Sequence, residues 1–310
     1  MSITVQNLSK KYGPQLAVND ISFEVKTGEI LGFLGPNGAG KTTTMKIITC
    51  YMAPSSGDVK VGQYSVLNNQ DQIKKKIGYL PESNPLYTDM QVLEYLEFVA
   101  KLQGVPSSKI EKRIAEMVHV CGLNIEKHKK IGELSKGYRQ RVGLAQAMIH
   151  DPEILILDEP TTGLDPNQIV EIRKLIRELG REKTVILSTH ILPEVEATCD
   201  RILIINEGKI VADGTPETLR KQAQGQEIIK VEVSDAANSD DVITALSSIP
   251  SVAMVDPVKD KQFSYYINSK ENQSSKREVF ETVVKNNWVL TEMTPIETKL
   301  EDIFRDLTTN

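Results

Sequence analysis

Residues 35–42, GPNGAGKT, decide the fold of this chain, because they match the pattern G-x-x-x-x-G-K-[ST] between a strand-like and a helix-like run. The apolar run GEILGFLG, residues 28–35, predicts a buried strand, and KTTTMKIITCYM, residues 41–52, has helix length and composition. Glycines let the backbone N–H groups of such a turn point inward, and the following helix adds the positive end of its dipole. The stretch therefore predicts a nucleotide phosphate site. The alternative is a glycine turn that only caps a helix.

The polar residues of this loop have expected partners on a nucleoside triphosphate. Lys41 is expected to reach the β- and γ-phosphates as a point charge, and the Thr42 hydroxyl to ligate Mg²⁺. Thr43 is expected to make a second phosphate contact. The other residues expected to bind the nucleotide here are Gly35, Asn37, Gly38, Ala39 and Gly40.

The hydrophobic pattern on both sides of the loop predicts an α/β fold. Residues 3–34 read as three short strands, and residues 85–150 carry apolar positions at helical spacing, which indicates a helical insertion. Residues 154–205 alternate apolar strands with amphipathic helices, a pattern typical of a parallel sheet covered on both faces. We place a domain boundary in the polar, glutamine-rich stretch that ends at residue 224.

Beyond that boundary, residues 225–310 predict a small accessory domain. Its segments read as strand, helix, strand, strand, helix and strand, the order of a ferredoxin-like α+β fold. A last helix, IETKLEDIFRDL, follows at residues 296–307.

Two carboxylates and a histidine stand at the ends of predicted core strands. Asp158 and Glu159 end the apolar run ILILDE, at the sheet edge where doubly wound folds bind ligands. Asp158 is expected to hold Mg²⁺, and Glu159 to orient or deprotonate the water that attacks the γ-phosphate. His190 follows KTVILST and is expected to contact the γ-phosphate or that water. Two acids capping a turn, and a structural histidine, are the alternatives.

Composition argues against several other classes of protein. The 310 residues hold 37 basic and 42 acidic side chains, and the net charge of −5 gives no overall attraction for nucleic acid or anionic lipid. The sequence lacks an apolar run of about 18 residues and a signal-peptide pattern at its start, so we expect a cytoplasmic location. Three widely spaced cysteines suggest reduced interior thiols rather than a zinc cluster or disulfides.

A fourth motif, LSKGYRQR at residues 134–141, makes the chain resemble the ATP-binding cassette (ABC) ATPases, whose signature sequence is LSGGQ. The resemblance covers residues 3–222 with all motifs in order. It implies a P-loop ABC cassette fold, with a parallel-sheet core, an antiparallel β subdomain and a helical insertion, and it implies ATP and Mg²⁺ as ligands. It also implies a head-to-tail homodimer in which Ser135 and the Gly137 amide contact the γ-phosphate bound by the other subunit.

The same resemblance suggests further roles. Tyr12 in KKYG resembles the aromatic residue that stacks on adenine, and Asp165 lies in TTGLDP, which resembles the loop across the dimer interface. Glu82 stands where the family usually has a glutamine that binds the metal. A carboxylate can still bind Mg²⁺, but it cannot donate an amide hydrogen bond to water. The signature also departs from the family pattern, with Lys136 and Tyr138 in place of glycine and glutamine.

As a whole, the sequence is most similar to exporter-type ATP-binding subunits, and most of all to those of gliding-motility transporters. This likeness implies a peripheral protein at the cytoplasmic face of the inner membrane, working with integral permease subunits on separate chains and without nucleic acid. One alternative is a soluble ABC ATPase that acts on ribosomes or nucleic acid. Another is a regulatory nucleotide-binding module with little turnover.

Overall fold

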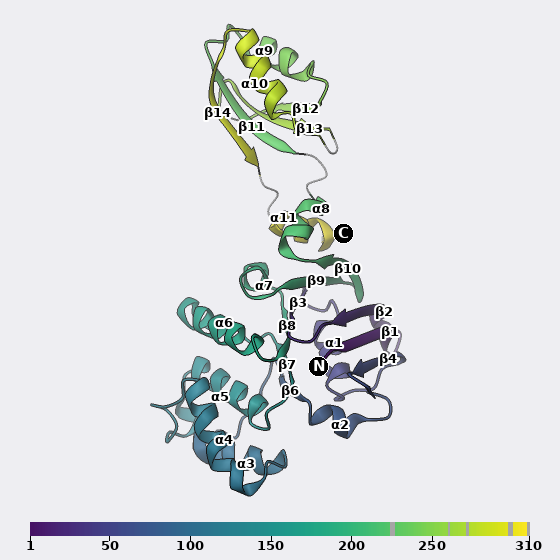
Figure 1. Cartoon of the computed structure of the whole chain (residues 1–310), viewed down its shortest axis with the longest axis vertical. Coiled ribbons are helices and arrows are strands. Elements are labelled where there is room, and N and C mark those ends of the chain that lie inside the picture. The colour runs from purple at the N-terminus through teal and green to yellow at the C-terminus, as the bar shows by residue number, and fades with distance from the viewer. Residues whose placement is uncertain (224–226, 260, 271–272, 297–299, 309–310) are drawn as a thin grey trace. The chain divides into compact units, whose positions relative to one another are not determined.

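The computed structural model describes residues 1–223, 227–259, 261–270, 273–296 and 300–308 (Figure 1). Its residues divide into two compact units. The first contains Met1–Pro216 together with the terminal segment from Phe304, and the second contains Glu217–Ile303.

A six-stranded sheet forms the centre of the first unit, in the order β10-β9-β3-β8-β7-β6. Neighbouring strands from β9 to β6 are parallel, and β10 is antiparallel to β9. The parallel sheet predicted from residues 154–205 is thus confirmed, with the carboxyl ends of β3, β7 and β8 at one edge. The strands are β3 (Ile30–Leu34), β6 (Ile77–Leu80), β7 (Ile154–Asp158), β8 (Thr184–Thr189), β9 (Arg201–Asn206) and β10 (Lys209–Gly214).

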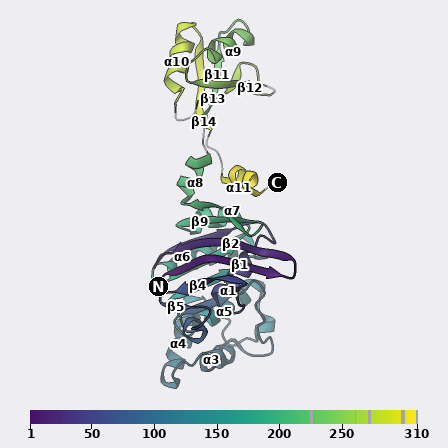
Figure 2. The same ribbon diagram turned by 90° about the vertical axis from the view of Figure 1, so that its right-hand side faces the viewer.

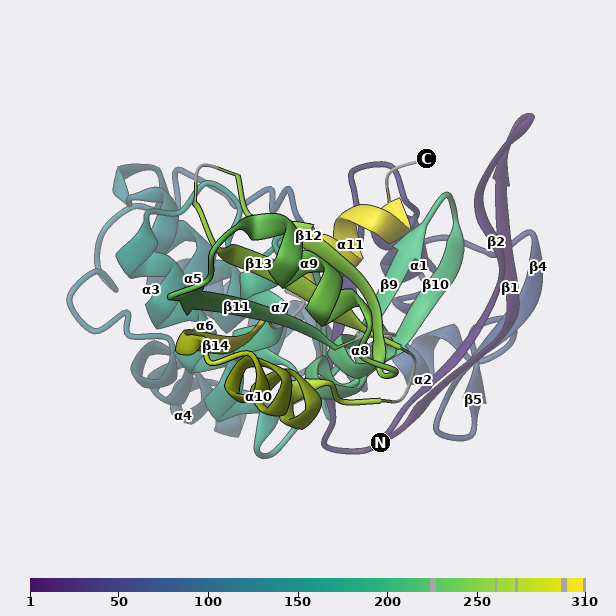
Figure 3. The ribbon, with the colours of Figure 1, turned by 90° about the horizontal axis from the view of Figure 1, so that it is seen from above.

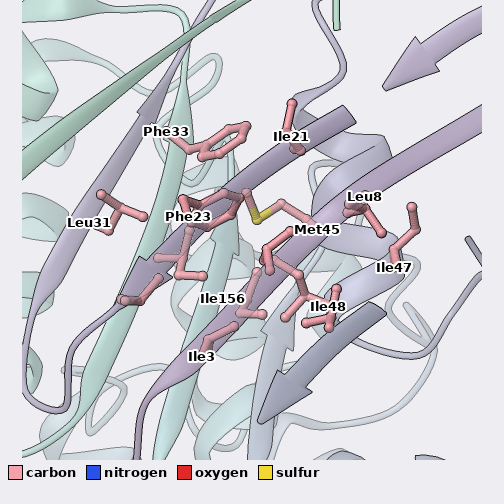
Figure 4. Close-up of a cluster of buried hydrophobic side chains, with 14 of the residues drawn as sticks. Ile3, Leu8, Ile21, Phe23, Leu31, Phe33, Met45, Ile47, Ile48 and Ile156 are labelled. Carbon is pink, nitrogen blue, oxygen red and sulfur yellow. The ribbon is translucent and has the colours of Figure 1, made fainter. Parts of the chain in front are cut away.

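A second, antiparallel sheet packs against the first, in the order β2-β1-β4-β5. Figure 2 shows β1, β2 and β4 side by side. Buried positions from both sheets and from the helix after the glycine-rich loop form one hydrophobic core (Figure 4). In it, the rings of Phe23 and Phe33 lie 5.6 Å apart between centroids. The strands are β1 (Ile3–Tyr12), β2 (Gln15–Val25), β4 (Ser56–Val61) and β5 (Tyr64–Ser65).

Helices surround the central sheet and form the predicted insertion between β6 and β7. Helix α1 (Lys41–Ile48) starts directly after the glycine-rich loop, and α6 (Pro166–Gly180) and α7 (Leu192–Thr198) follow β7 and β8. The short polar helix α2 (Gln70–Lys74) was not predicted, since it has no apolar periodicity. None of the helices in the described ranges is both long and apolar enough to span a membrane. The insertion contains α3 (Val92–Leu102), α4 (Ser107–Val120), the 3₁₀ turn η1 (Ile131–Glu133) and α5 (Lys136–Met148).

The second unit has a four-stranded antiparallel sheet in the order β12-β13-β11-β14. Two of its helices, α9 and α10, pack on the sheet around a separate hydrophobic core, and Figure 3 views them from above. The predicted order of elements is present, while the ferredoxin-like assignment stays a prediction. The elements are β11 (Ile228–Ser234), α9 (Ser239–Ser247), β12 (Val252–Pro257), β13 (Ser264–Ser269), α10 (Lys276–Lys285) and β14 (Val289–Ile296).

The units divide differently from the predicted boundary between residues 224 and 225. The described part of the polar stretch in which we place the boundary forms helix α8 (Pro216–Ala223), which starts at a proline, a residue favoured in the first turn of a helix. The terminal helix α11 (Leu300–Thr308) is split, because its residues from Phe304 onward belong to the first unit. There the Leu307 carbonyl accepts a hydrogen bond of 3.3 Å from Asn206 Nδ2.

Candidate functional site

The glycine-rich loop joins the end of β3 to the start of α1. Gly40 has a φ of 108°, and a Cβ at this position would lie 2.5 Å from the Ala17 carbonyl oxygen. Only glycine avoids both the strain and the collision. Lys41 folds back over the loop, where its Nζ donates hydrogen bonds to the carbonyls of Gly35 at 2.8 Å and Pro36 at 3.1 Å. The loop thus holds the buried ammonium group of Lys41 against its own backbone carbonyls.

Asp158, the last residue of β7, is fully buried at the sheet edge. Its Oδ1 accepts hydrogen bonds from Thr42 Oγ1, at 3.2 Å, and from Ser188 Oγ. Its Oδ2 has no hydrogen-bond partner. Burial raises the pKa of Asp158, because the charged form loses its hydration. The protein therefore holds a carboxylate whose charge its own groups satisfy only in part.

Glu159 is the centre of a hydrogen-bonded group of side chains. Its Oε2 lies 2.9 Å from His190 Nδ1 and accepts a hydrogen bond of 3.3 Å from Thr162 Oγ1. Because a carboxylate only accepts, Nδ1 of His190 is assigned as the donor. Glu159 Oε1 lies 3.5 Å from Lys41 Nζ and has no hydrogen bond. The residue has a φ of 49°, in the strained left-handed region, which is where functional residues often lie.

These side chains surround one cavity of about 340 Å³. The loop, the segments that follow β7 and β8, and residues from two other segments contribute to it. An adjoining hollow of about 440 Å³ shares Thr42 and Glu82 with the first and includes Asp158. The cavity is lined by Ala17, Asn37, Gly38, Gly40, Lys41, Thr42, Thr43, Glu82, Glu159, Thr162 and His190.

Most residues predicted from the sequence are therefore brought together here. Gly35 contributes its carbonyl to Lys41, and Ala39 is buried with its N–H bonded to the Pro36 carbonyl at 3.2 Å. Glu82 stands at the wall between the two hollows, where its predicted metal contact stays a prediction.

Tyr12 does not line the cavity. Its ring is partly exposed, its hydroxyl donates to Met52 Sδ at 2.9 Å, and Lys10 Nζ lies 5.6 Å from the ring centroid. The adenine contact expected of Tyr12 thus stays a prediction.

The signature residues also lie outside the cavity of their own chain. Ser135 is exposed and caps α5, its Oγ accepting the N–H of Tyr138 at 3.3 Å. Gly137 is buried against Gln168 at the start of α6, since a Cβ there would lie 2.6 Å from the Gln168 side chain. Asp165 caps α6, accepting the Gln168 N–H at 2.9 Å. A site that uses Ser135 and Gly137 would need a second chain.

The donor set suits Mg²⁺ held together with a nucleotide. The Thr42 hydroxyl and the unpartnered Asp158 Oδ2 offer hard oxygen ligands, which Mg²⁺ prefers. Within the described ranges, no group of three or more His, Cys, Asp or Glu side chains could hold a metal ion. An ion bound here would take its remaining ligands from phosphates and water, the usual arrangement for Mg²⁺ in nucleotide sites.

Several residues of the site were not identified from the sequence. Ala17 and Thr162 line the cavity, and Ser188 holds Asp158. The sequence signal for Ser188 is a polar residue near the end of a mostly apolar strand, two positions before the predicted histidine.

Comparisons with known proteins show the family to which the chain is similar. A family model described as ABC transporter matches residues 18–162, and a second, described as AAA domain, putative AbiEii toxin, Type IV TA system, matches residues 130–195. The ABC transporter ATP-binding protein YxlF of Bacillus subtilis is 39% identical over 222 residues, 72% of this chain and 74% of that protein. The linearmycin resistance ATP-binding protein LnrL of the same organism is 40% identical over 235 residues, 75% of each chain.

An export protein and two solved structures show the same similarity. The Nod factor export ATP-binding protein I of Burkholderia orbicola is 36% identical over 246 residues, 79% of this chain and 81% of that protein. A solved ATP-binding subunit of an ABC transporter matches with a TM-score of 0.65 and 31% identity, over 72% of this chain and 93% of that one. A dimeric post-hydrolysis state of the cassette MJ0796, bound to ADP and Pi, matches with a TM-score of 0.62 and 26% identity, over 69% and 98%.

Proposed function

Since this chain belongs to the ABC transporter family as one of its ATP-binding, ATP-hydrolysing subunits, we propose that it forms a homodimer on ATP and drives export by separate membrane subunits. The observation that carries the hydrolysis step of this proposal is the position of Glu159. One carboxylate oxygen of Glu159 lies 2.9 Å from His190 Nδ1, and the other lies 3.5 Å from Nζ of Lys41, the lysine of the glycine-rich loop.

The binding step uses the groups of the loop. Lys41 exchanges its contacts with the Gly35 and Pro36 carbonyls for phosphate oxygens, where a charged donor is worth more. Thr42 and Asp158 would hold Mg²⁺, with Glu82 as a further candidate ligand beside them. The ion, when bound, would supply positive charge that stabilises the negative charge of the reacting phosphates.

The hydrolysis step uses the group around Glu159. Its carboxylate orients the attacking water and accepts a proton from it, as a base within hydrogen-bond reach can do. His190 and Thr162 hold Glu159 Oε2, which leaves Oε1 to face Lys41 and the phosphate. His190 lines the same cavity, so its ring can also contact the γ-phosphate.

The proposed dimer follows from the position of the signature residues. Ser135 and Gly137 lie outside the cavity of their own chain, and Ser135 is exposed at the start of α5. In a head-to-tail pair, these residues of one chain contact the γ-phosphate held by the other, and Asp165 lies in the loop between them. The solved cassette MJ0796, which is similar over 69% of this chain, is a dimer. ATP binding then closes the dimer and hydrolysis opens it.

The transport role is proposed from the names of relatives. Two of the relatives reported above are named for Nod factor export and linearmycin resistance, which supports export by permease subunits on other chains. We propose a peripheral position at the cytoplasmic face of the membrane, with the helical insertion as the contact to the permease. The similarity to gliding-motility subunits stays a prediction, because none of these relatives carries that name.

Substitution of the proposed base tests the proposal. Glu159→Gln keeps the size of the side chain but removes its basicity, so hydrolysis should fall by about a hundredfold or more. The variant should accumulate as an ATP-bound dimer, measured by size-exclusion chromatography with light scattering. Equal turnover by wild type and Glu159→Gln would contradict the role of Glu159, and equally low turnover by both would favour a regulatory module. Native complexes that contain ribosomes or nucleic acid, and no integral membrane protein, would favour the soluble ATPase.

A further inference from the structure

A buried carboxylate that belongs to no motif lies outside the cavity lining. Glu194, in the first turn of α7, is 2% exposed. Its Oε1 accepts a hydrogen bond of 2.7 Å from Thr161 Oγ1, and its Oε2 accepts one of 2.9 Å from Thr189 Oγ1. No cation among the described residues pairs with it. Two hydroxyl donors therefore satisfy a carboxylate that would be costly to bury without them.

The two threonines belong to the segments that carry the proposed catalytic side chains. Thr161 lies two residues after Glu159, on the segment that leaves β7. Thr189 ends β8 and directly precedes His190. Because β7 and β8 are parallel neighbours, both segments leave the sheet at the same edge. Glu194, which does not line the cavity, thus joins the two segments.

The residues next to these threonines contact Glu159. Thr162 donates to Glu159 Oε2 at 3.3 Å, and His190 contacts the same oxygen at 2.9 Å. Thr189 Oγ1 also accepts the N–H of Ile191 at 3.1 Å, so the backbone is fixed on both sides of His190. Each hydroxyl held by Glu194 is therefore one residue away from a group that orients Glu159.

The backbone at Glu159 gives a reason for such support. A φ of 49° is strained for a residue with a Cβ, and such conformations persist only where neighbouring contacts enforce them. The Glu159 N–H bonds to the Ser188 carbonyl at 3.0 Å, and Glu194 holds the next turn of the segment through Thr161. Loss of the Thr161 contact would let this segment relax away from His190.

We propose that Glu194 is a positioning residue for ATP hydrolysis. Its carboxylate fixes Thr161 and Thr189, and through them it sets Thr162 and His190 on Glu159 Oε2. It touches neither ATP nor the attacking water. The inference rests on the roles proposed above for Glu159 and His190.

The test compares full-length variants that differ by one hydroxyl. Thr161→Val removes the donor to Glu194 while keeping the shape of the side chain, and Thr161→Ser keeps the hydroxyl. Glu194→Gln leaves one acceptor oxygen for two hydroxyl donors, so one of the two threonines loses its acceptor. We expect Thr161→Val and Glu194→Gln to lower kcat for ATP about tenfold or more, with KM changed by less than about threefold. Both variants should accumulate as ATP-bound dimers, a result that misfolding alone would not give.

Further variants separate positioning from general stability. Thr161→Ser should turn over ATP within about twofold of wild type. The double variant Thr161→Val/Glu194→Gln should lose little more activity than either single variant, since both changes act on one network. Glu182→Gln is the matched control, because Glu182 is exposed and its side chain forms no hydrogen bond or ion pair within the described part of the chain.

Two results would overturn the inference. One is turnover by Thr161→Val and Glu194→Gln at the wild-type rate, and the other is a raised KM with unchanged kcat. If Glu194→Gln did not fold, the two Thr161 variants would still decide the question. A wild-type chain without ATP hydrolysis would contradict the proposed function itself, and the inference with it.

Discussion

Thr42 Oγ1 donates a hydrogen bond of 3.2 Å to Asp158 Oδ1, across 116 positions of sequence. The contact joins the first turn of α1 to the end of β7, so the two groups expected to hold Mg²⁺ are already adjacent. The second carboxylate oxygen, Asp158 Oδ2, is buried without a partner. A site arranged in this way is costly for the empty protein and suited to a bound cation.

Asp158→Asn should therefore make the nucleotide-free protein more resistant to unfolding, although hydrolysis falls by about a hundredfold or more. Burial raises the pKa of Asp158, so the native state binds its proton more tightly than the unfolded state does. Stability from this group is greatest at acid pH and is lost as pH rises through the native pKa. The neutral side chain of Asn avoids this loss of stability. Urea unfolding at pH 7 and pH 4 should therefore show a higher free energy of unfolding for the variant than for wild type, mainly at pH 7. A lower urea midpoint for Asp158→Asn than for wild type at pH 7 would contradict this prediction.

His190→Ala should lower kcat by about a hundredfold while ATP binding changes little, because the variant removes the donor at 2.9 Å from Glu159 Oε2. ATP affinity from isothermal titration and kcat from phosphate release would separate the two effects. His119→Ala is a control on the same unit, since His119 is exposed on α4, away from the site. A large loss of affinity with unchanged kcat would show that His190 acts in binding instead.

Gly40→Ala should destabilise the first unit by about 1–3 kcal/mol and abolish nucleotide binding. A methyl group at this φ of 108° would meet the Ala17 carbonyl oxygen at 2.5 Å. Gly38→Ala has a similar strain, at a φ of 82°, but no atom lies within 4 Å of its Cβ. The difference in unfolding free energy between the two variants measures the collision alone. Equal stabilities would mean that the loop moves away at little cost.

Glu82→Gln should raise the Mg²⁺ concentration needed for half-maximal hydrolysis by several fold, if the carboxylate is a ligand, because the amide is a weaker ligand for a hard cation. Glu82 lines both hollows beside Thr42, which places it within the same site. Titration of Mg²⁺ at saturating ATP makes the measurement. An unchanged Mg²⁺ dependence would remove Glu82 from the metal set.

Local sequence predicts much of this fold and site. The loop at residues 35–42 lies between a strand and a helix as predicted, and Asp158, Glu159 and His190 lie at the ends of neighbouring strands. These signals are local, since each depends on an apolar run and the residues that directly follow it.

The rest depends on contacts between distant segments. Ser188 reaches Asp158, and Glu194 reaches Thr161, only because β7 and β8 pair side by side. Nothing in the sequence near Glu194 indicates that pairing. Helices α2 and α8 have mostly polar sequences, so no apolar run marks either of them, and the boundary between residues 224 and 225 stays a prediction.

The central claim is that each hydrolysis site combines the loop of one chain with the signature of another. Lys41→Ala removes the ammonium group that binds the phosphates, and Ser135→Arg blocks the signature motif. Each variant alone should therefore be inactive. A mixed dimer keeps one complete site, formed by the loop of the Ser135→Arg chain and the signature of the Lys41→Ala chain. An equal mixture should therefore recover roughly a quarter of wild-type ATP turnover, because about half of the dimers are mixed and each has one working site in two. A mixture as inactive as its components, or a Ser135→Arg chain that is active alone, would contradict the claim.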